Sequence, residues 1–356
     1  MNVSRTGVIL AVCAGAVLLS GVAGARNRAR VLAGGQPGDS GYQLKKKIKI
    51  GGEGGWDYLT FDSATRRLFI SRGAKVIVVD VDADKVVGEI PDTPGVHGIA
   101  LAPELNKGFT SNGRGNNVTV FDLKTLATLD HVPTGENPDA IVYDPAMKRV
   151  FTMNGRSKDA TAIDAQTGQV DGTIALGGRP EFAAADGKAH VYINIEDKSE
   201  IVELDSKKLT VVSRWPLAPC EEPSGLAMDT HNRRLFAGCH NKMMAVVDAD
   251  SGKVIATPPI GQGVDANAFD SGTRFAFASN GDGTLTVVRE ESPAKFTVVE
   301  DVATQRGART MALDPKSHEV YLVTAEFGPR PEPTTENPQP RPPMIPDTFT
   351  VLVLAR

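Results

Sequence analysis

The chain has 356 residues, of which 41% are hydrophobic and 23% are charged, so it has enough apolar material for a large core. Its 43 acidic and 39 basic residues give a formal net charge of −4, which provides no broad basic surface for nucleic acid. The sequence also has no nucleotide-binding glycine motif and no haem-attachment Cys-x-x-Cys-His. Nucleotide-dependent and haem-dependent functions are therefore not indicated.

The first 25 residues have the pattern of a secretory signal peptide. Arg5 precedes an uncharged apolar run, and Ala23-Gly-Ala25 is an A-x-A cleavage pattern. Cleavage after Ala25 would place the mature protein in the periplasm or outside the cell, without a transmembrane anchor. The alternative is a retained membrane helix, because the run approaches the ~20 residues that span a bilayer. Residues 26–42, with three arginines and a Gly-rich run, are predicted to form a flexible linker.

From residue 43 onward, one phrase returns seven times. In its fullest form, at residues 137–154, it reads as a loop ending in Pro-Asp, an apolar strand, a polar turn and a second strand ending in Asn. The steps between equivalent positions are 40 to 44 residues, a period typical of propeller arrays, in which one unit cannot bury its own apolar faces. These equivalent positions are Asp57, His97, Asp139, Glu181, Ser224, Asp265 and Arg309.

The two ends of the repeat region complete each other. Residues 43–51 resemble the fourth strand of a unit that has no preceding strands, and residues 348–354 resemble a third strand with nothing after it. If the first strand joins the last unit, the ring closes and leaves no exposed sheet edge between the ends. The predicted fold is therefore all-β, a single seven-bladed β-propeller of four-stranded antiparallel blades over residues 43–356.

The second strands of the units carry a family resemblance. Most begin with large apolar residues and end in small or polar residues. Several of the phrases start with Pro, and the one at residues 137–154 contains the turn Asp144-Pro. The pattern resembles the YVTN-repeat β-propeller family, of the YncE-like secreted kind. The resemblance implies the fold but not one activity, because propellers serve as binding modules, lactonases, lyases and quinoprotein subunits. The strands that carry it include Leu68–Arg72, Gly108–Asn112, Val150–Asn154, Leu235–Cys239 and Val320–Thr324.

One mouth of the central channel is the predicted functional site. In this topology the loops before the inner strands and after the second strands open on the same face. Carboxylates, an imidazole and a guanidinium gathered there would shift each other's pKa values and attract a cation or a polar ligand. The alternative is that each acid accepts backbone N–H groups of a turn. The predicted ligand-binding residues are Asp57, His97, Asp139, Glu181, Ser224, Asp265, Arg309, Asn112, Arg114, Asn154, Arg156, Asn280 and Glu326.

Two features of this set bear on its chemistry. Asn112, Asn154 and Asn280 are each followed by Gly, so they are equally explained as turn residues. The acids suit a hard cation such as Ca²⁺, which binds carboxylate and amide oxygens. Propeller lactonases use such an ion to polarise a lactone carbonyl, so a metal-assisted hydrolase or lyase is an alternative function. The candidate metal ligands are Asp57, Asp139, Glu181 and Asp265.

Cys220 and Cys239 are the only cysteines after the predicted signal peptide. Cys239 ends the second strand of the fifth unit, and Cys220 lies just before the neighbouring inner strand. In an exported protein this arrangement favours a disulfide. The alternative is a copper-type site formed by the two thiolates and His240.

Residues 328–347 contain eight prolines and interrupt the last unit between its second and third strands. They are predicted to form an extended loop on the face of the acidic residues, either as a mobile surface loop or as a lid or docking segment, with Glu326, Arg330 and Arg341 as polar contacts.

The preferred hypothesis is an exported, monomeric binding module for a small polar ligand or another exported protein, because no nucleophile–base pair has a recognisable spacing. A lactonase-like hydrolase is the alternative. Single-stranded DNA is a further alternative, which requires that Arg72, Arg114, Arg156 and Arg309 form a basic crescent on the same face.

Overall fold

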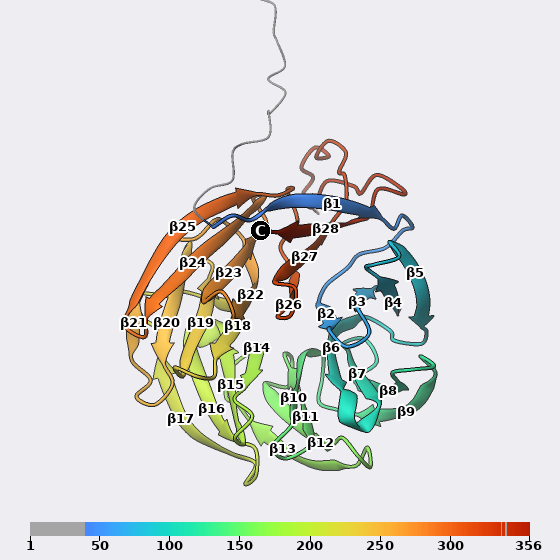
Figure 1. Ribbon diagram of the computed structural model, residues 1–356. Coiled ribbons are helices and arrows are strands. Elements are labelled where there is room, and N and C mark those ends of the chain that lie inside the picture. Colours follow the sequence, from blue (N-terminus) through green and yellow to red (C-terminus); the bar gives the residue numbers. More distant parts are fainter. Residues whose placement is uncertain (1–39, 336, 339) are drawn as a thin grey trace, which may run out of the picture. The chain divides into compact units, whose positions relative to one another are not determined.

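The computed structural model describes residues 40–335, 337–338 and 340–356. The predicted signal peptide and most of the predicted linker lie outside these residues. The described chain forms seven four-stranded antiparallel sheets arranged as a ring (Figure 1). It contains two short 3₁₀ helices, η1 (Pro103–Leu105) and η2 (Glu196–Lys198), and no α-helix among the described residues. No helix there has the length and hydrophobicity to cross a membrane.

The first four blades follow one another along the chain, each with its strands in sequence order from the channel outward. Blade 1 contains β2 (Leu59–Asp62), β3 (Arg67–Arg72), β4 (Lys75–Asp80) and β5 (Lys85–Ile90). Blade 2 contains β6 (Val96–Ala102), β7 (Lys107–Asn112), β8 (Asn117–Asp122) and β9 (Thr128–Pro133). Blade 3 contains β10 (Pro138–Asp144), β11 (Arg149–Asn154), β12 (Asp159–Asp164) and β13 (Val170–Ala175). Blade 4 contains β14 (Pro180–Ala185), β15 (His190–Ile195), β16 (Glu200–Asp205) and β17 (Thr210–Pro216).

The last three blades complete the ring. Blade 5 contains β18 (Pro223–Asp229), β19 (Arg234–Cys239), β20 (Met243–Asp248) and β21 (Val254–Ala256). Blade 6 contains β22 (Val264–Asp270), β23 (Phe275–Asn280), β24 (Thr284–Ser292) and β25 (Lys295–Ala303). Blade 7 contains β26 (Met311–Asp314), β27 (Glu319–Thr324), β28 (Thr350–Ala355) and the N-terminal strand β1 (Gln43–Lys49).

The N-terminal strand closes the ring, as the sequence predicts. β1 pairs antiparallel with β28, with Ile48 opposite Val351, and lies across the outer side of blade 7 in Figure 1. Tyr42 belongs to the predicted linker, but it is part of the core. Its side chain is 1% exposed, its ring centroid lies 5.1 Å from that of Phe277, and its hydroxyl donates a 2.8 Å hydrogen bond to the carbonyl of His318.

The core consists of apolar layers between neighbouring blades. Each of the seven hydrophobic clusters in the described chain joins side chains of two adjacent blades, and the cluster around Tyr42 joins blades 6 and 7. Second and third strands are covered on both faces, so they are almost continuously apolar, as in Leu68–Ile70 and Val76–Val79. A blade therefore cannot bury its faces without neighbours, which is why the chain needs the complete ring.

Acids at the ends of the third strands hold turns on the face opposite the predicted site. Asp122 Oδ1, for example, accepts the backbone N–H groups of Lys124 and Thr125 at 2.9 and 2.8 Å. Asp80, Asp164, Asp205 and Asp248 do the same in their blades. This repeated acid is therefore a structural turn residue.

Candidate functional site

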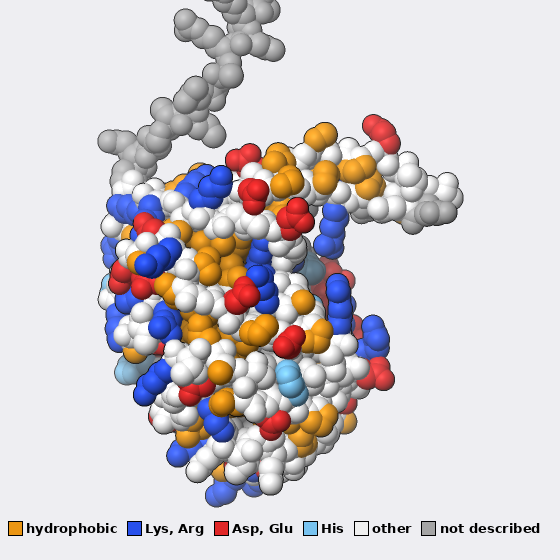
Figure 2. Space-filling model, turned by 90° about the vertical axis from the view of Figure 1, so that its right-hand side faces the viewer, with side chains coloured by type: hydrophobic (Ala, Val, Ile, Leu, Met, Phe, Trp, Pro, Cys, Tyr) orange, Lys and Arg blue, Asp and Glu red, His pale blue; other side chains and the backbone are white. Residues whose placement is uncertain are grey.

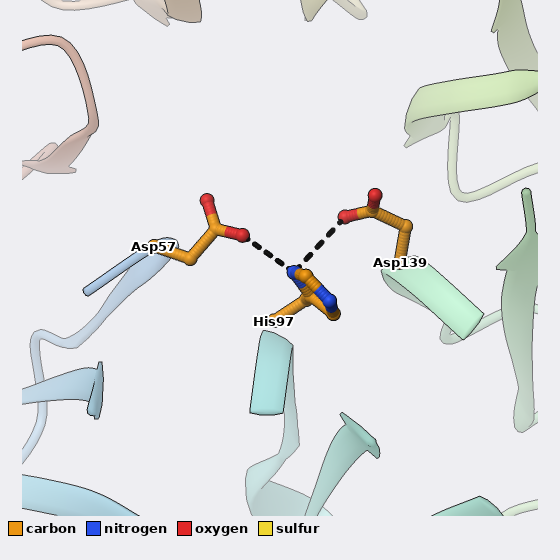
Figure 3. A group of neighbouring side chains, drawn as sticks. All are labelled: Asp57, His97 and Asp139. Carbon is orange, nitrogen blue, oxygen red and sulfur yellow. Dashed lines mark hydrogen bonds and ion pairs between the residues drawn. The ribbon is translucent and has the colours of Figure 1, made fainter. Parts of the chain in front are cut away.

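Three of the predicted residues form a tight group at the channel mouth. Asp57, His97 and Asp139 come from blades 1, 2 and 3, and one ligand atom from each lies within 4.8 Å of the others. His97 Nδ1 lies 2.6 Å from Asp57 Oδ2 and 3.7 Å from Asp139 Oδ1, so both carboxylates face the same ring nitrogen (Figure 3). An ionised carboxylate only accepts hydrogen bonds, so Nδ1–H donates to Asp57, whereas the Asp139 contact is an ion pair too long for a hydrogen bond.

The local backbone fixes His97 in this position. The ladder between β6 and β7 shifts register between Val96 and Ile99, and within this irregular stretch the N–H of Gly98 donates a 2.8 Å hydrogen bond to Ser111 Oγ. The other ring nitrogen, Nε2, lies against Gly113. A Cβ at Gly113 would be only 2.8 Å from Nε2, so a side chain there would displace the imidazole.

Three neighbouring carboxyl groups have raised pKa values, and of these only Glu181 keeps its proton at neutral pH. Burial raises the pKa of Asp139 to about 6, although His97 lowers it. Burial and the charges of Asp139, Glu196 and Asp265 raise the pKa of Glu181 to about 9. Burial likewise raises the pKa of Asp265 to about 6, against the effect of Arg309, whose Nη1 lies 2.9 Å from Asp265 Oδ1. The acids of the mouth therefore act as one electrostatic cluster.

Burial affects the pKa of the His97 imidazole in the direction opposite to its effect on the carboxyl groups. Burial lowers the pKa of His97, but the hydrogen bond to Asp57 and the charges of Asp139 and Asp57 outweigh it, so the net pKa is raised. Among the residues that the structure describes, Asp57, Asp139, Glu181 and Asp265 accept no hydrogen bond from a backbone N–H. The turn-capping alternative thus does not account for these four acids.

Sequence reasoning missed the aromatic residues beneath the acids. The Tyr58 and Phe182 rings, from blades 1 and 4, lie 4.9 Å apart between centroids. Burial, and then the charges of Asp139, Glu181, Asp57 and Asp265, raise the pKa of Tyr58 well above its usual value. The sequence does distinguish these two residues. The residue that follows the equivalent position is Gly, Ala or Thr in the other five units and is aromatic only in these two.

Glu196 and Arg179 are two further residues near the mouth that the repeat pattern does not predict. Glu196 lies in η2, which in blade 4 takes the place of the Asn-Gly turn of blades 2, 3 and 6. It forms an ion pair with Arg179. Both act on the pKa of Asp139, which Glu196 raises and Arg179 lowers. Asp139, Arg156, Arg179 and Glu181 line a hollow of about 280 Å³ between blades 3 and 4.

Four other predicted residues are buried within the blades. Asn112, Asn154 and Asn280 are 0% exposed, and each amide donates to a threonine hydroxyl in the third strand of its own blade. Ser224 is 3% exposed, and its hydroxyl donates to the carbonyl of Asp265 at 3.3 Å. The side chains of these residues bind neighbouring strands and blades and are not available at the mouth, which corrects their assignment as ligand-binding residues.

The structure does not form the proposed basic crescent. Arg72 is 6% exposed, its guanidinium lies 3.9 Å from the Phe349 ring centroid, and it donates hydrogen bonds to the carbonyls of Gly54 and Glu53. Arg114 and Arg156 are exposed, whereas Arg309 is paired with Asp265. Arg72 therefore stabilises blade 1 and is not available to bind a phosphate backbone.

Cys220 and Cys239 form a disulfide in blade 5. Both cysteines are buried, with exposed fractions of 2% and 0%. The bond confirms the predicted pairing. A copper-type site is excluded in this state, because neither sulfur is a free thiolate.

Glu326 and the Pro-rich loop lie beside the mouth. The loop is fixed at its base, where Gly328 N–H donates to the carbonyl of Pro343 and Ile345 N–H to that of Glu326, each at 2.8 Å. Glu326 is exposed and lines a second hollow, which the base of the loop forms together with Trp56 and Arg309.

Solved structures of other proteins share this fold. A chain of Kuenenia stuttgartiensis hydrazine synthase has a TM-score of 0.66 at 15% identity, covering 75% of this chain and 92% of its own. U3-55K and the WD40 repeats of RRP9 each have a TM-score of 0.72, at 8% and 7% identity. They cover 89% of this chain and 99% and 98% of their own.

The chain is a seven-bladed β-propeller, the fold that these structures share. Identities this low show the fold alone, and propellers generally serve as binding or scaffold modules. No family model and no curated protein matches the sequence, so membership of the YVTN-repeat family stays a prediction.

Proposed function

We propose that this protein is an exported, YncE-like binding module that holds a divalent metal ion, and through it a small polar ligand, at the mouth of its channel. The observation that carries the proposal is the convergence of Asp57, His97 and Asp139 from three adjacent blades. One ligand atom of each residue lies within 4.8 Å of the others, and the proton on His97 Nδ1 is donated to Asp57. A divalent cation would replace that proton and satisfy both carboxylates.

The ligand types favour a transition-metal ion over the Ca²⁺ expected from the sequence. Ca²⁺ takes oxygen ligands, whereas an imidazole with carboxylates suits Zn²⁺ and similar ions. Glu181 and Asp265 were also predicted as metal ligands, but they lie outside the group of three. They would instead face a ligand that completes the coordination of the ion.

Isothermal titration with Zn²⁺, Mn²⁺ and Ca²⁺, after removal of metal by a chelator, tests the proposal. We expect one equivalent of Zn²⁺ to bind, and both His97→Gln and Asp139→Asn to weaken binding at least about tenfold. Glu89→Gln, which removes an exposed acid paired with Lys75 on the outside of blade 1, serves as the charge control. The metal site is refuted if the two site variants bind Zn²⁺ as tightly as the control.

Two features support export of the protein from the cytoplasm. The Cys220–Cys239 disulfide suits an oxidising compartment, and residues 1–25 have the signal-peptide pattern. Fractionation of cells that express the full chain should recover a protein whose first residue is Arg26. Recovery of the uncleaved chain in the membrane fraction would contradict this part of the proposal.

A hydrolase is the second candidate, and one observation favours it. A carboxyl group with a pKa of about 9, as at Glu181, stays protonated at neutral pH and can donate a proton to a leaving group. Lactones are the substrates that the family resemblance suggests. Acid release from a panel of lactones should then be lost in Glu181→Gln and unchanged in Glu89→Gln, and the absence of any turnover by the metal-loaded wild type would remove this candidate.

A further inference from the structure

A second hollow of about 1020 Å³ lies between the channel mouth and the base of the Pro-rich loop. Figure 2 shows the loop projecting over a hollowed face on which basic and acidic side chains gather. The residues that line this hollow come from the segments on either side of the loop, from the segment before β26 and from the start of blade 1. It is separate from the group of Asp57, His97 and Asp139.

Guanidinium groups dominate the charge of this hollow. Its lining contains four arginines and a single acid, Glu326. Within residues 40–335, 337–338 and 340–356, the side chains of Arg306, Arg330 and Arg341 form no ion pair or hydrogen bond, and Arg309 pairs with Asp265. Unpaired guanidinium groups around one concave surface attract an anion, and each offers a fork that matches a carboxylate.

One wall of the hollow is aromatic. The Trp56 ring centroid lies 6.2 Å from that of Phe327 and 5.1 Å from that of Phe349. Phe327 is 40% exposed and Ile345 is 39% exposed, although both are large apolar residues. An exposed apolar wall opposite cationic groups suits a ligand with a flat apolar part and an anionic part.

This wall is held in place without a ligand. Phe327 forms a β-bridge with Met344, next to the hydrogen bonds that fix the loop base. Gly307 makes room for the ring, because a Cβ there would lie 3.2 Å from Phe327 Cε2 at a backbone φ of +83°. A preformed pocket loses less conformational entropy when a ligand binds.

We propose that this hollow binds a small organic anion with two or more carboxylates on an aromatic or other flat apolar frame. Its size is that of a small-molecule pocket, at the upper end of the usual ~300–1,000 Å³. A single-stranded nucleic acid fits less well, because it needs a basic groove several nucleotides long, and here the acids Asp265 and Glu326 border the arginines. The site goes beyond the proposed metal-binding function and does not depend on it.

Trp56 provides a direct readout for the test. The chain has two tryptophans, and the other, Trp215, stacks on Tyr192 in blade 4. In a Trp215→Phe background, benzene-1,3,5-tricarboxylate should change the Trp56 fluorescence saturably. Benzyltrimethylammonium, an aromatic cation, should not.

Two matched double variants separate the pocket from general charge effects. Arg330→Gln with Arg341→Gln should weaken tricarboxylate binding roughly tenfold or more. Lys45→Gln with Lys49→Gln removes two charges from the exposed side of β1 and should leave binding unchanged. Equal melting temperatures for the two double variants confirm that both are folded, since all four side chains are exposed.

Three results would overturn the proposal. The first is no saturable fluorescence change with the tricarboxylate. The second is equal weakening in the lysine and arginine variants, which would indicate only an attraction to net charge. The third is binding of an oligothymidylate that the arginine substitutions abolish while the tricarboxylate does not bind, which would assign the hollow to nucleic acid.

Discussion

Tyr58 and Phe182 contact each other across the central channel, with their ring centroids 4.9 Å apart and their planes at 32°. Their strands belong to blades 1 and 4, which are not neighbours in the ring. The pair fills axial space that Gly, Ala and Thr leave open in the other five blades, and it lies against the acids of the mouth. The mouth is therefore a well with an apolar floor, which explains the raised pKa values of its carboxyl groups.

Removing part of this floor should destabilise the protein. We expect Phe182→Ala to lower the free energy of unfolding by about 2–4 kcal/mol, because the half-buried ring loses its contact with Tyr58 and leaves a cavity. Phe182→Leu, which keeps most of the volume, should cost less than half as much. Urea denaturation measures both, and equal costs for the two variants would contradict a packing role.

Glu181 should make the protein less stable as the pH rises. Its folded-state pKa of about 9 lies above the ordinary value of 4.5, so the native state binds more protons than the unfolded state between these values. Stability from this group is therefore complete below about pH 4.5 and declines as the pH rises towards 9.

The neutral substitution Glu181→Gln should remove this decline. At pH 8 the variant should be more stable than wild type by about 1–3 kcal/mol, and near pH 4.5 the two should be similar. Thermal denaturation across this pH range, with Glu89→Gln as control, measures the difference. A variant that is less stable than wild type at pH 8 would show that Glu181 is ionised in the native state.

The disulfide in blade 5 should contribute substantially to stability. It closes a short loop, with a sequence separation of 19 between Cys220 and Cys239. Replacing both cysteines by alanine should lower the free energy of unfolding by about 2–4 kcal/mol. Addition of a reductant should lower the melting temperature of the wild type and leave that of the double variant unchanged, and two titratable thiols in the native wild type would contradict the bond.

Tyr42 should be a major determinant of ring closure. We expect Tyr42→Ala to cost about 3–5 kcal/mol, because a fully buried ring between blades 6 and 7 is lost. Tyr42→Phe removes only the hydrogen bond to the carbonyl of His318 and should cost about 1 kcal/mol. Hydrogen exchange should show faster opening of β1 and β28 in the alanine variant, and protection equal to wild type would show that closure does not depend on Tyr42.

The sequence by itself determined the fold, because each unit repeats the same pattern of apolar strands, whose faces only neighbouring units can bury. The period of the phrase, the apolar second and third strands and the unmatched strands at the two ends predict seven blades closed by β1, and the structure has these features. The pairing of Cys220 with Cys239 was the favoured prediction as well, because Cys239 ends a strand and Cys220 lies just before the neighbouring strand, whose first residue Pro223 is opposite Cys239.

Only the tertiary structure decided which mouth residues act together. The repeat places Asp57, His97, Asp139 and Ser224 at equivalent positions, but side-chain direction and burial differ among blades, so Ser224 is buried while the first three converge. Arg72 donates a hydrogen bond to the carbonyl of Gly54 and lies over the ring of Phe349. Its position in the repeat does not predict these contacts. The arginine-lined hollow depends on a loop that is outside the repeat, so no periodicity could place it.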